Sequence, residues 1–139
     1  MTDSRNTAIA ALTLRVSLGT MFVAHALLKY FVFTLPGTAE FFQSLGLPGL
    51  LGYVTFAVEL IGGILLIAGV STRAVALTLV PVMIGATWAH AGNGWLFTAP
   101  NGGWEYPAFW TITLIVQALL GDGAWAMRPS SREPELRAA

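Results

Sequence analysis

The fold is decided by the stretch Arg15-Val-Ser-Leu-Gly-Thr-Met-Phe-Val-Ala-His-Ala-Leu-Leu-Lys29, an apolar helix that carries three ionisable side chains. At about 100° per residue, Arg15 and Lys29 fall on one narrow face of this helix, and His25 lies at the edge of that face. A charge at membrane depth costs at least roughly 2.5 to 3.5 kcal/mol on insertion scales. Each of the three side chains therefore predicts a partner on another helix or a polar ligand.

The composition of the 139-residue chain is that of an integral membrane protein. Hydrophobic residues make up 55% of the chain and charged residues 10%, whereas charged residues make up about 25% of soluble domains. The formal net charge is zero and there is no basic run, so we expect no nucleic-acid partner. The absence of cysteine excludes thiolate catalysis, cysteine-ligated iron–sulfur clusters and covalently attached c-type haem. A redox role would need a bound cofactor or substrate.

The beginning of the chain has the outline of a signal peptide, because Arg5 precedes an apolar run that reaches Ala24-His25-Ala26. Two features argue against cleavage. Arg15 interrupts the apolar run, and apolar residues continue past Ala26 as far as Phe33. We interpret this segment as a retained first span.

Four apolar segments predict an all-α integral membrane protein, a four-transmembrane-helix bundle forming one membrane domain over residues 1–139. At ~1.5 Å per residue, each predicted span reaches a large part or all of a ~30 Å hydrocarbon core. The predicted spans cover approximately residues 8–31, 48–68, 73–90 and 105–121.

The segments between and after the spans set the expected topology. Residues 38–45 predict a short interfacial helix, and residues 122–139 predict a polar cytoplasmic tail that is disordered at its end. Most basic residues lie on one side of this arrangement, so the positive-inside rule predicts that both termini are cytoplasmic. The basic residues on that side are Arg5, Arg73, Arg128, Arg132 and Arg137.

One charge, Glu59, lies near the middle of the second span, among small residues that let a neighbouring helix approach closely. Counted from the expected inner ends of the spans, Arg15 and Glu59 lie at nearly the same depth. We therefore predict an intramembrane ion pair between Arg15 and Glu59. Such a pair can act in function or only fix the helix register.

A second polar group is expected at the outer face. His25 and Lys29 end the first span, His90 ends the third, and Glu105 begins the fourth, where an acidic residue suits the helix dipole. Aromatic residues surround these groups, as is also typical of membrane interfaces. We predict an outward-facing polar pocket that binds a ligand, and we expect no metal site. Its predicted residues are His25, Lys29, His90, Trp104, Glu105 and Tyr106.

Taken in order, the motifs of the chain resemble those of the DoxX family over roughly residues 8–123. The resemblance implies a four-helix protein of the bacterial inner membrane. It also implies a link to quinol oxidase, to thiosulfate:quinone oxidoreduction and to other membrane oxidoreductase complexes, which transfers only by analogy. The motifs are Arg15-x-x-x-Gly19-x-x-Phe22-x-x-His25 with Lys29, Glu59-Leu-Ile-Gly62-Gly63, Gly69-x-x-Thr72-Arg73, His90-x-x-Asn93-Gly94 and Gly102-Gly103-Trp104-Glu105-Tyr106.

Three functions follow from these features. The first is an accessory, non-autonomous subunit of a quinone-linked oxidoreductase, in which His25, Lys29 and His90 help to bind the quinone. The second is a b-type haem held between His25 and His90. The third is a non-catalytic membrane scaffold or a component of a small-molecule permease. For each of them we expect association with the bilayer and assembly into a homo-oligomer or a complex with oxidoreductase subunits.

Overall fold

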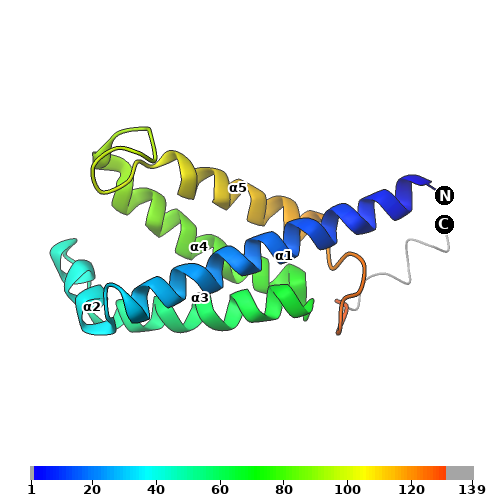
Figure 1. Cartoon of the computed structure of the whole chain (residues 1–139), viewed down its shortest axis with the longest axis horizontal. Helices are drawn as coiled ribbons and strands as arrows, with labels where there is room; N and C mark the ends of the chain where they lie inside the picture. The colour runs from blue at the N-terminus through cyan, green and yellow to red at the C-terminus, as the bar shows by residue number, and fades with distance from the viewer. Residues whose placement is uncertain (1, 131–139) are drawn as a thin grey trace.

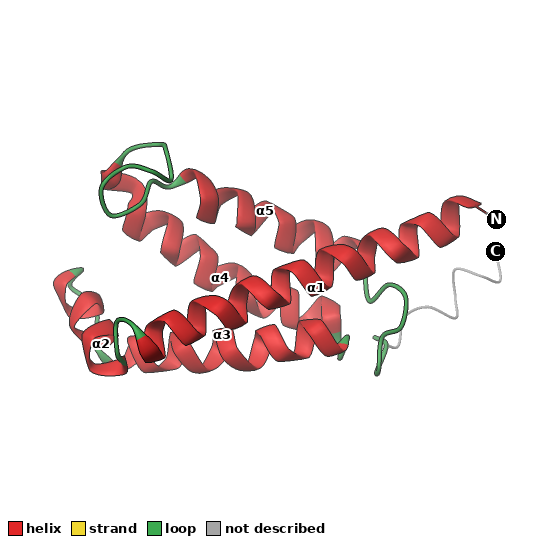
Figure 2. Ribbon diagram, in the orientation of Figure 1, coloured by secondary structure: helices red, strands yellow, loops and turns green. Residues whose placement is uncertain are grey.

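The computed structural model describes residues 2–130, and apart from one isolated β-bridge the regular structure in that range is helical. The ribbon in Figure 2 contains no sheet within this part of the chain. The predicted all-α fold is thereby confirmed. In chain order the elements are α1 (Thr2–Phe31), α2 (Leu35–Ser44), α3 (Leu50–Ala68), α4 (Thr72–His90), the 3-10 turn η1 (Ala91–Asn93) and α5 (Glu105–Leu120).

The helix bounds agree with the predicted spans to within a few residues, except at the start of the chain. α1 begins at Thr2 and not near residue 8, so it includes residues that were expected to form a polar tail. Asp3 lies in the first turn, where a negative charge interacts favourably with the helix dipole. α2 begins earlier than expected because the Thr34 side chain accepts a hydrogen bond from the Gly37 N–H and Pro36 suits a first turn.

Three helical stretches are long and apolar enough to cross a membrane: Asp3–Phe31, Leu50–Ala68 and Thr72–Asn93. The fourth predicted span corresponds to α5, which has 16 residues. At roughly 1.5 Å per residue such a helix is about 24 Å long, shorter than a ~30 Å hydrocarbon core. By length and composition, the described chain thus has three candidate spans and one shorter apolar helix.

The helices pack as two antiparallel pairs, α1 with α3 and α4 with α5 (Figure 1). The two pairs separate toward the end that holds α2 and residues 91–104, which we call the loop end. The other end, where α1 begins, is called the N-terminal end. The two pairs are linked by a short turn, because only Gly69, Val70 and Ser71 join α3 to α4.

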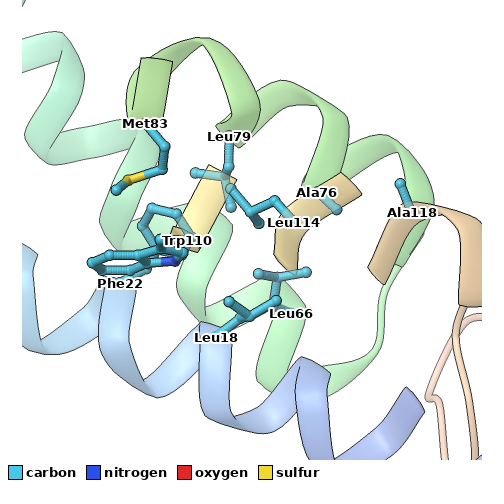
Figure 3. Packing of buried hydrophobic residues seen from close by; sticks show 9 residues of the cluster. All are labelled: Leu18, Phe22, Leu66, Ala76, Leu79, Met83, Trp110, Leu114 and Ala118. Carbon is cyan, nitrogen blue, oxygen red and sulfur yellow. The ribbon is translucent and has the colours of Figure 1, made fainter. Parts of the chain in front are cut away.

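The two pairs meet at one core of buried side chains that comes from all four long helices (Figure 3). Within this core the rings of Phe22 and Trp110 lie 4.6 Å apart. On α4 the hydrophobic residues buried in this core are Ala76, Leu79 and Met83. The core residues are Leu18, Phe22, Leu66, Ala76, Leu79, Met83, Trp110, Leu114 and Ala118.

Two glycines form the contact between α1 and α3. A Cβ atom on Gly19 would lie 2.6 Å from the carbonyl oxygen of Gly63, and one on Gly63 would lie 2.8 Å from that of Gly19. Small residues at such a contact let membrane helices approach backbone to backbone. The small-residue face predicted around Glu59 is therefore confirmed, and Gly19 and Gly63 set the register between the two helices.

The first part of the predicted polar tail packs against the bundle. In this post-α5 segment (residues 121–130), the Ala124 N–H donates to the Ala8 carbonyl and the Met127 N–H to that of Ala68. Arg128 pairs with the turn after α3 in a short parallel bridge through Val70. The segment thus joins α1 to the α3–α4 turn. The disorder expected at the end of the tail falls on residues 131–139, outside the described range.

Candidate functional site

The buried carboxylate of α3 pairs with a lysine and not with the predicted arginine. Nζ of Lys29 lies 2.7 Å from Oε2 of Glu59, and the two side chains are 18% and 7% exposed. A buried charge at this depth requires such a partner. The predicted ion pair between Arg15 and Glu59 is wrong.

The helix register explains this error. Because Gly19 lies level with Gly63 in an antiparallel pair, Arg15 lies level with the end of α3, about 12 Å from the level of Glu59 at roughly 1.5 Å per residue. Helical side chains lean toward the N-terminus of their own helix. Lys29 and Glu59 therefore lean toward each other, whereas Arg15 leans away from Glu59.

Arg15 instead anchors the post-α5 segment at the N-terminal end of the bundle. Its side chain is 1% exposed, and Nη2 donates to the Ala124 carbonyl at 3.1 Å. Nη1 packs on the Cα of Gly69, a position where no Cβ would fit. The negative charge of the Asp122 carboxylate attracts the Arg15 guanidinium. Sequence reasoning missed Asp122 and Ala124 because this segment looked like a solvated tail.

Asp122 organises the turn beneath the arginine. Its Oδ1 accepts from the Thr72 N–H at 3.0 Å, and its Oδ2 accepts from the Ser130 N–H at 2.7 Å. Burial alone would raise the pKa of the Asp122 carboxyl, but the hydrogen bonds from Ser130 and Thr72 more than offset burial and hold the pKa below its ordinary value. The carboxylate thereby caps the start of α4 and ties it to the chain after α5.

His25 lies between the ion pair and the core. Its Nδ1 is 2.9 Å from the Met21 carbonyl, and its ring meets the ring of Trp110 edge-on at 4.8 Å. The imidazole is also close enough to interact electrostatically with the Glu59 carboxylate. Trp110 was not predicted as a site residue. Its position one helical turn after Tyr106, on the same face, was the signal that could have identified it.

A hydrogen bond between side chains joins α4 to α5 at the loop end. The Tyr106 hydroxyl lies 3.0 Å from Nε2 of His90, and Nδ1 of the same ring lies 2.8 Å from the Ala86 carbonyl. A carbonyl can only accept, so in the neutral imidazole Nδ1 carries the proton and Nε2 accepts from the tyrosine O–H. Both residues are half-buried. Within the described residues, His90 and Tyr106 are the only two predicted pocket residues that are hydrogen-bonded to each other.

Glu105 and Trp104 hold the loop of residues 94–104. Oε1 of Glu105 accepts from the Phe97 N–H at 2.9 Å, and the Trp104 ring meets that of Trp95 edge-on at 4.5 Å. The Asn93 amide closes the same loop on the Gly102 carbonyl at 2.9 Å. In this structure the carboxylate therefore supports the loop.

The sequence of this chain matches the family model DoxX over residues 10–92. The chain belongs to the DoxX family. A protein of Bacillus subtilis (strain 168), named "Putative oxidoreductase CatD", is 41% identical over 122 residues, which cover 87% of this chain and 86% of that protein. No solved structure matches this chain. The long apolar helices and the family together make the chain a multi-pass membrane protein.

In this DoxX chain the six predicted pocket residues fall into separate groups. Lys29 and His25 lie with Glu59 on the α1–α3 pair, and His90 lies with Tyr106 on the α4–α5 pair. Trp104 lines an open apolar hollow of about 580 Å³ on the outside of α4 and α5. The DoxX match includes Lys29, Glu59 and His90 and reaches residue 92, whereas Tyr106 comes after it.

The two histidines do not fit a b-type haem in this arrangement. Axial ligation needs a free ring nitrogen on each histidine. Both ring nitrogens of His90 are engaged, Nδ1 by the Ala86 carbonyl and Nε2 by the Tyr106 hydroxyl. His25 has only its Nδ1 engaged, by the Met21 carbonyl, so it could supply one axial ligand but not the pair. A quinone makes a different demand, since its carbonyls need hydrogen-bond donors and its ring an apolar or aromatic wall. This chain has donors of that kind in the Tyr106 hydroxyl and the Lys29 ammonium. It has an aromatic wall in the Trp110 ring.

Proposed function

We propose that this DoxX protein is an accessory membrane subunit of a quinone-linked oxidoreductase system and binds a quinone, or a similar carbonyl ligand, at the loop end of its bundle. The observation that carries the proposal is the half-buried Tyr106–His90 hydrogen bond, which bridges two helices and offers a hydroxyl backed by an imidazole. The similarity to a relative named an oxidoreductase supports the same class of function.

The level of the polar groups supports a shared site. His25 and Trp110 are in contact across the core. Lys29 lies one turn beyond His25 on α1, toward the loop end. Because α5 runs antiparallel to α1, Tyr106 lies one turn from Trp110 in the same direction. The two polar pairs thus lie at similar depth on opposing helix pairs, above an aromatic wall formed by Phe22 and Trp110.

The chain's own groups can bind and move protons. A bound quinone would supply the two-electron redox chemistry. With a ligand bound, the Tyr106 O–H would turn from Nε2 of His90 to a ligand carbonyl. His90, protonated on both ring nitrogens, would then donate from Nε2 to the tyrosine oxygen and return a proton to it as the hydroxyl proton passes to the ligand. Lys29 would offer a second donor while remaining paired with Glu59. Because the sequence has no cysteine, electrons must come from a partner subunit or from a separately bound cofactor.

We further propose four spans in the bacterial inner membrane with both termini cytoplasmic. α5 contributes Trp110, Leu114 and Ala118 to the core that it shares with α4. If α4 spans the bilayer, α5 therefore lies in the bilayer beside it. A helix shorter than the hydrocarbon core can be accommodated by local thinning of the bilayer. Arg5, Arg73 and Arg128 belong to the N-terminal end, which the positive-inside rule assigns to the cytoplasm.

A non-catalytic scaffold or permease component is the alternative. The observation that favours it is that both polar pairs satisfy each other within the chain, Lys29 with Glu59 and Tyr106 with His90. Paired groups of this kind can fix helix register without any ligand. The two functions differ in what stays with the protein when it leaves the membrane.

The proposal is tested by mild extraction of the full chain from its own membrane, followed by native mass spectrometry and an absorption spectrum of the same sample. We expect a retained quinone, or co-purifying oxidoreductase subunits, and the retained quinone should be lost in Tyr106→Phe. The matched control is Tyr53→Phe, which changes an exposed tyrosine of α3. A homo-oligomer with neither quinone nor oxidoreductase subunits would overturn the proposal in favour of the scaffold or permease.

A further inference from the structure

A second hollow lies at the N-terminal end of the bundle, remote from the polar pairs. It has a volume of about 340 Å³. It forms where the post-α5 segment crosses α1, held there by the hydrogen bond from the Ala124 N–H to the Ala8 carbonyl. Its lining residues are Arg5, Ala8, Ile9, Leu12, Ala124 and Trp125.

The arginine at this hollow is not used by the fold. Arg15 donates to the Ala124 carbonyl, and Arg73 donates to the Ala118 carbonyl at the end of α5. Arg5 is exposed, and within residues 2–130 no hydrogen bond or ion pair is found for its guanidinium. Asp3 lies only two positions away, but residues two apart on a helix do not face each other. The positive charge of Arg5 is therefore available to a ligand.

The remaining walls of the hollow are apolar, and two of their side chains are exposed. Ile9 is 45% exposed and the Trp125 indole 87%, although both lie beside a charged residue. Tryptophan next to arginine at the end of an apolar helix is the arrangement typical of the membrane interface. The hollow thus combines a cation with surfaces that are favourable in contact with acyl chains.

The length of α1 places this hollow at the edge of the bilayer. With 30 residues, α1 is about 45 Å long at roughly 1.5 Å per residue, which exceeds a ~30 Å hydrocarbon core. Its first turns carry the polar residues Asp3, Ser4, Arg5 and Asn6, so this end is the one that extends into the headgroup region. Arg5 then lies at the level of lipid phosphates, and Leu12, two turns further along, lies near the start of the hydrocarbon.

We propose that this hollow, which we call the N-terminal hollow, binds an anionic phospholipid of the leaflet at this end of the bundle. The lipid phosphate pairs with the planar guanidinium of Arg5, whose geometry suits two oxygens of one phosphate. An acyl chain lies over Ile9 and Leu12, and the Trp125 ring packs at the glycerol level. This inference does not depend on the quinone role, because it uses different residues at the opposite end of the bundle.

The test uses the full chain in nanodiscs made from equal amounts of phosphatidylglycerol and phosphatidylcholine, from which the protein is released and its retained lipids are counted by native mass spectrometry. We expect phosphatidylglycerol to be enriched. Arg5→Gln should lower the enrichment about fivefold, as expected for one basic residue at a lipid surface. Arg128→Gln removes an exposed charge that does not line the hollow, and it should leave most of the enrichment.

A second variant separates a bound lipid from general charge attraction. Ile9→Trp fills the hollow without changing the charge, and it should also lower the enrichment of phosphatidylglycerol. The proposal is overturned if Arg5→Gln and Arg128→Gln reduce the enrichment equally, or if Ile9→Trp has no effect. Free inorganic phosphate, added in place of lipid, should give no retained adduct. A phosphate adduct without lipid enrichment would also overturn the proposal.

Discussion

Nζ of Lys29 on α1 lies 2.7 Å from Oε2 of Glu59 on α3, and this contact joins two apolar helices in the interior of the bundle. Neither charge is tolerated in hydrocarbon without the other. Together with the Gly19–Gly63 contact, the pair also fixes how far α1 extends past α3.

Removing one member of the pair should destabilise the protein far more than removing both. Lys29→Met or Glu59→Met alone leaves an uncompensated buried charge, with an expected loss of about 3–5 kcal/mol in the free energy of unfolding. The double variant should recover most of that loss. The measurement is reversible unfolding in mixed micelles, with Glu40→Gln on exposed α2 as a control for loss of charge. Strictly additive losses would contradict a direct pair.

The contact between Gly19 and Gly63 predicts opposite effects of alanine at two glycines. Gly19→Ala would place a Cβ 2.6 Å from the Gly63 carbonyl oxygen, so we expect a loss of about 1–3 kcal/mol from overpacking. A Cβ on Gly85, within α4, would have nothing within 4 Å. Gly85→Ala should be neutral or stabilise by up to about 1 kcal/mol through helix propensity. Thermal unfolding of the two variants in one detergent makes the comparison.

The packing of Arg15 on Gly69 predicts a difference between two glycines that share a left-handed backbone. Gly69 (φ 71°) and Gly46 (φ 78°) both strain any other residue, but a Cβ at Gly69 also meets the guanidinium of Arg15 while one at Gly46 meets nothing within 4 Å. Gly46→Ala should therefore cost about 1–2 kcal/mol, and Gly69→Ala more. Equal losses would mean that Arg15 moves aside without cost.

The hydrogen bonds to Asp122 predict an acid-sensitive contribution to stability. The pKa of this carboxyl is lowered in the folded state, so its contribution is present at neutral pH and is lost as the pH falls below about 4 toward the folded-state pKa. Thermal unfolding between pH 7 and pH 3 measures this loss. Asp122→Asn should lower the melting temperature at pH 7 and reduce its fall at low pH. An unchanged pH dependence in this variant would refute the assignment.

Much of the fold could be predicted because apolar periodicity reports directly on helices. The small residues around Glu59 were predictable in this way. The start of α1 was not, since Asp3 and Thr7 look like a polar tail but favour a first helical turn. α5 was predicted at nearly its observed bounds, because Pro107 in the first turn and Gly121 at the end mark it.

The pairing of charges was less predictable because it depends on helix register. In the observed register Arg15 lies roughly eight residues from the level of Glu59, and Lys29 becomes the partner of that carboxylate. Distance from the expected span ends cannot fix that register, whereas the closest glycine contact does. The His90–Tyr106 contact followed from two helix ends joined by one loop. The docking of Ala124 under Arg15 left no signal in apolar periodicity, since it uses backbone carbonyls.

Quinone binding is tested most directly by titrating the purified protein with a short-chain quinone analogue. The quenching of tryptophan fluorescence is the signal that reports binding. The account predicts saturable quenching, because Trp110 and Trp104 lie near the loop end. Tyr106→Phe should weaken the affinity about two- to tenfold through loss of one hydrogen bond, and Tyr53→Phe should leave it unchanged. Quenching that does not saturate, or equal affinities for the two variants, would contradict quinone binding at the His90–Tyr106 pair.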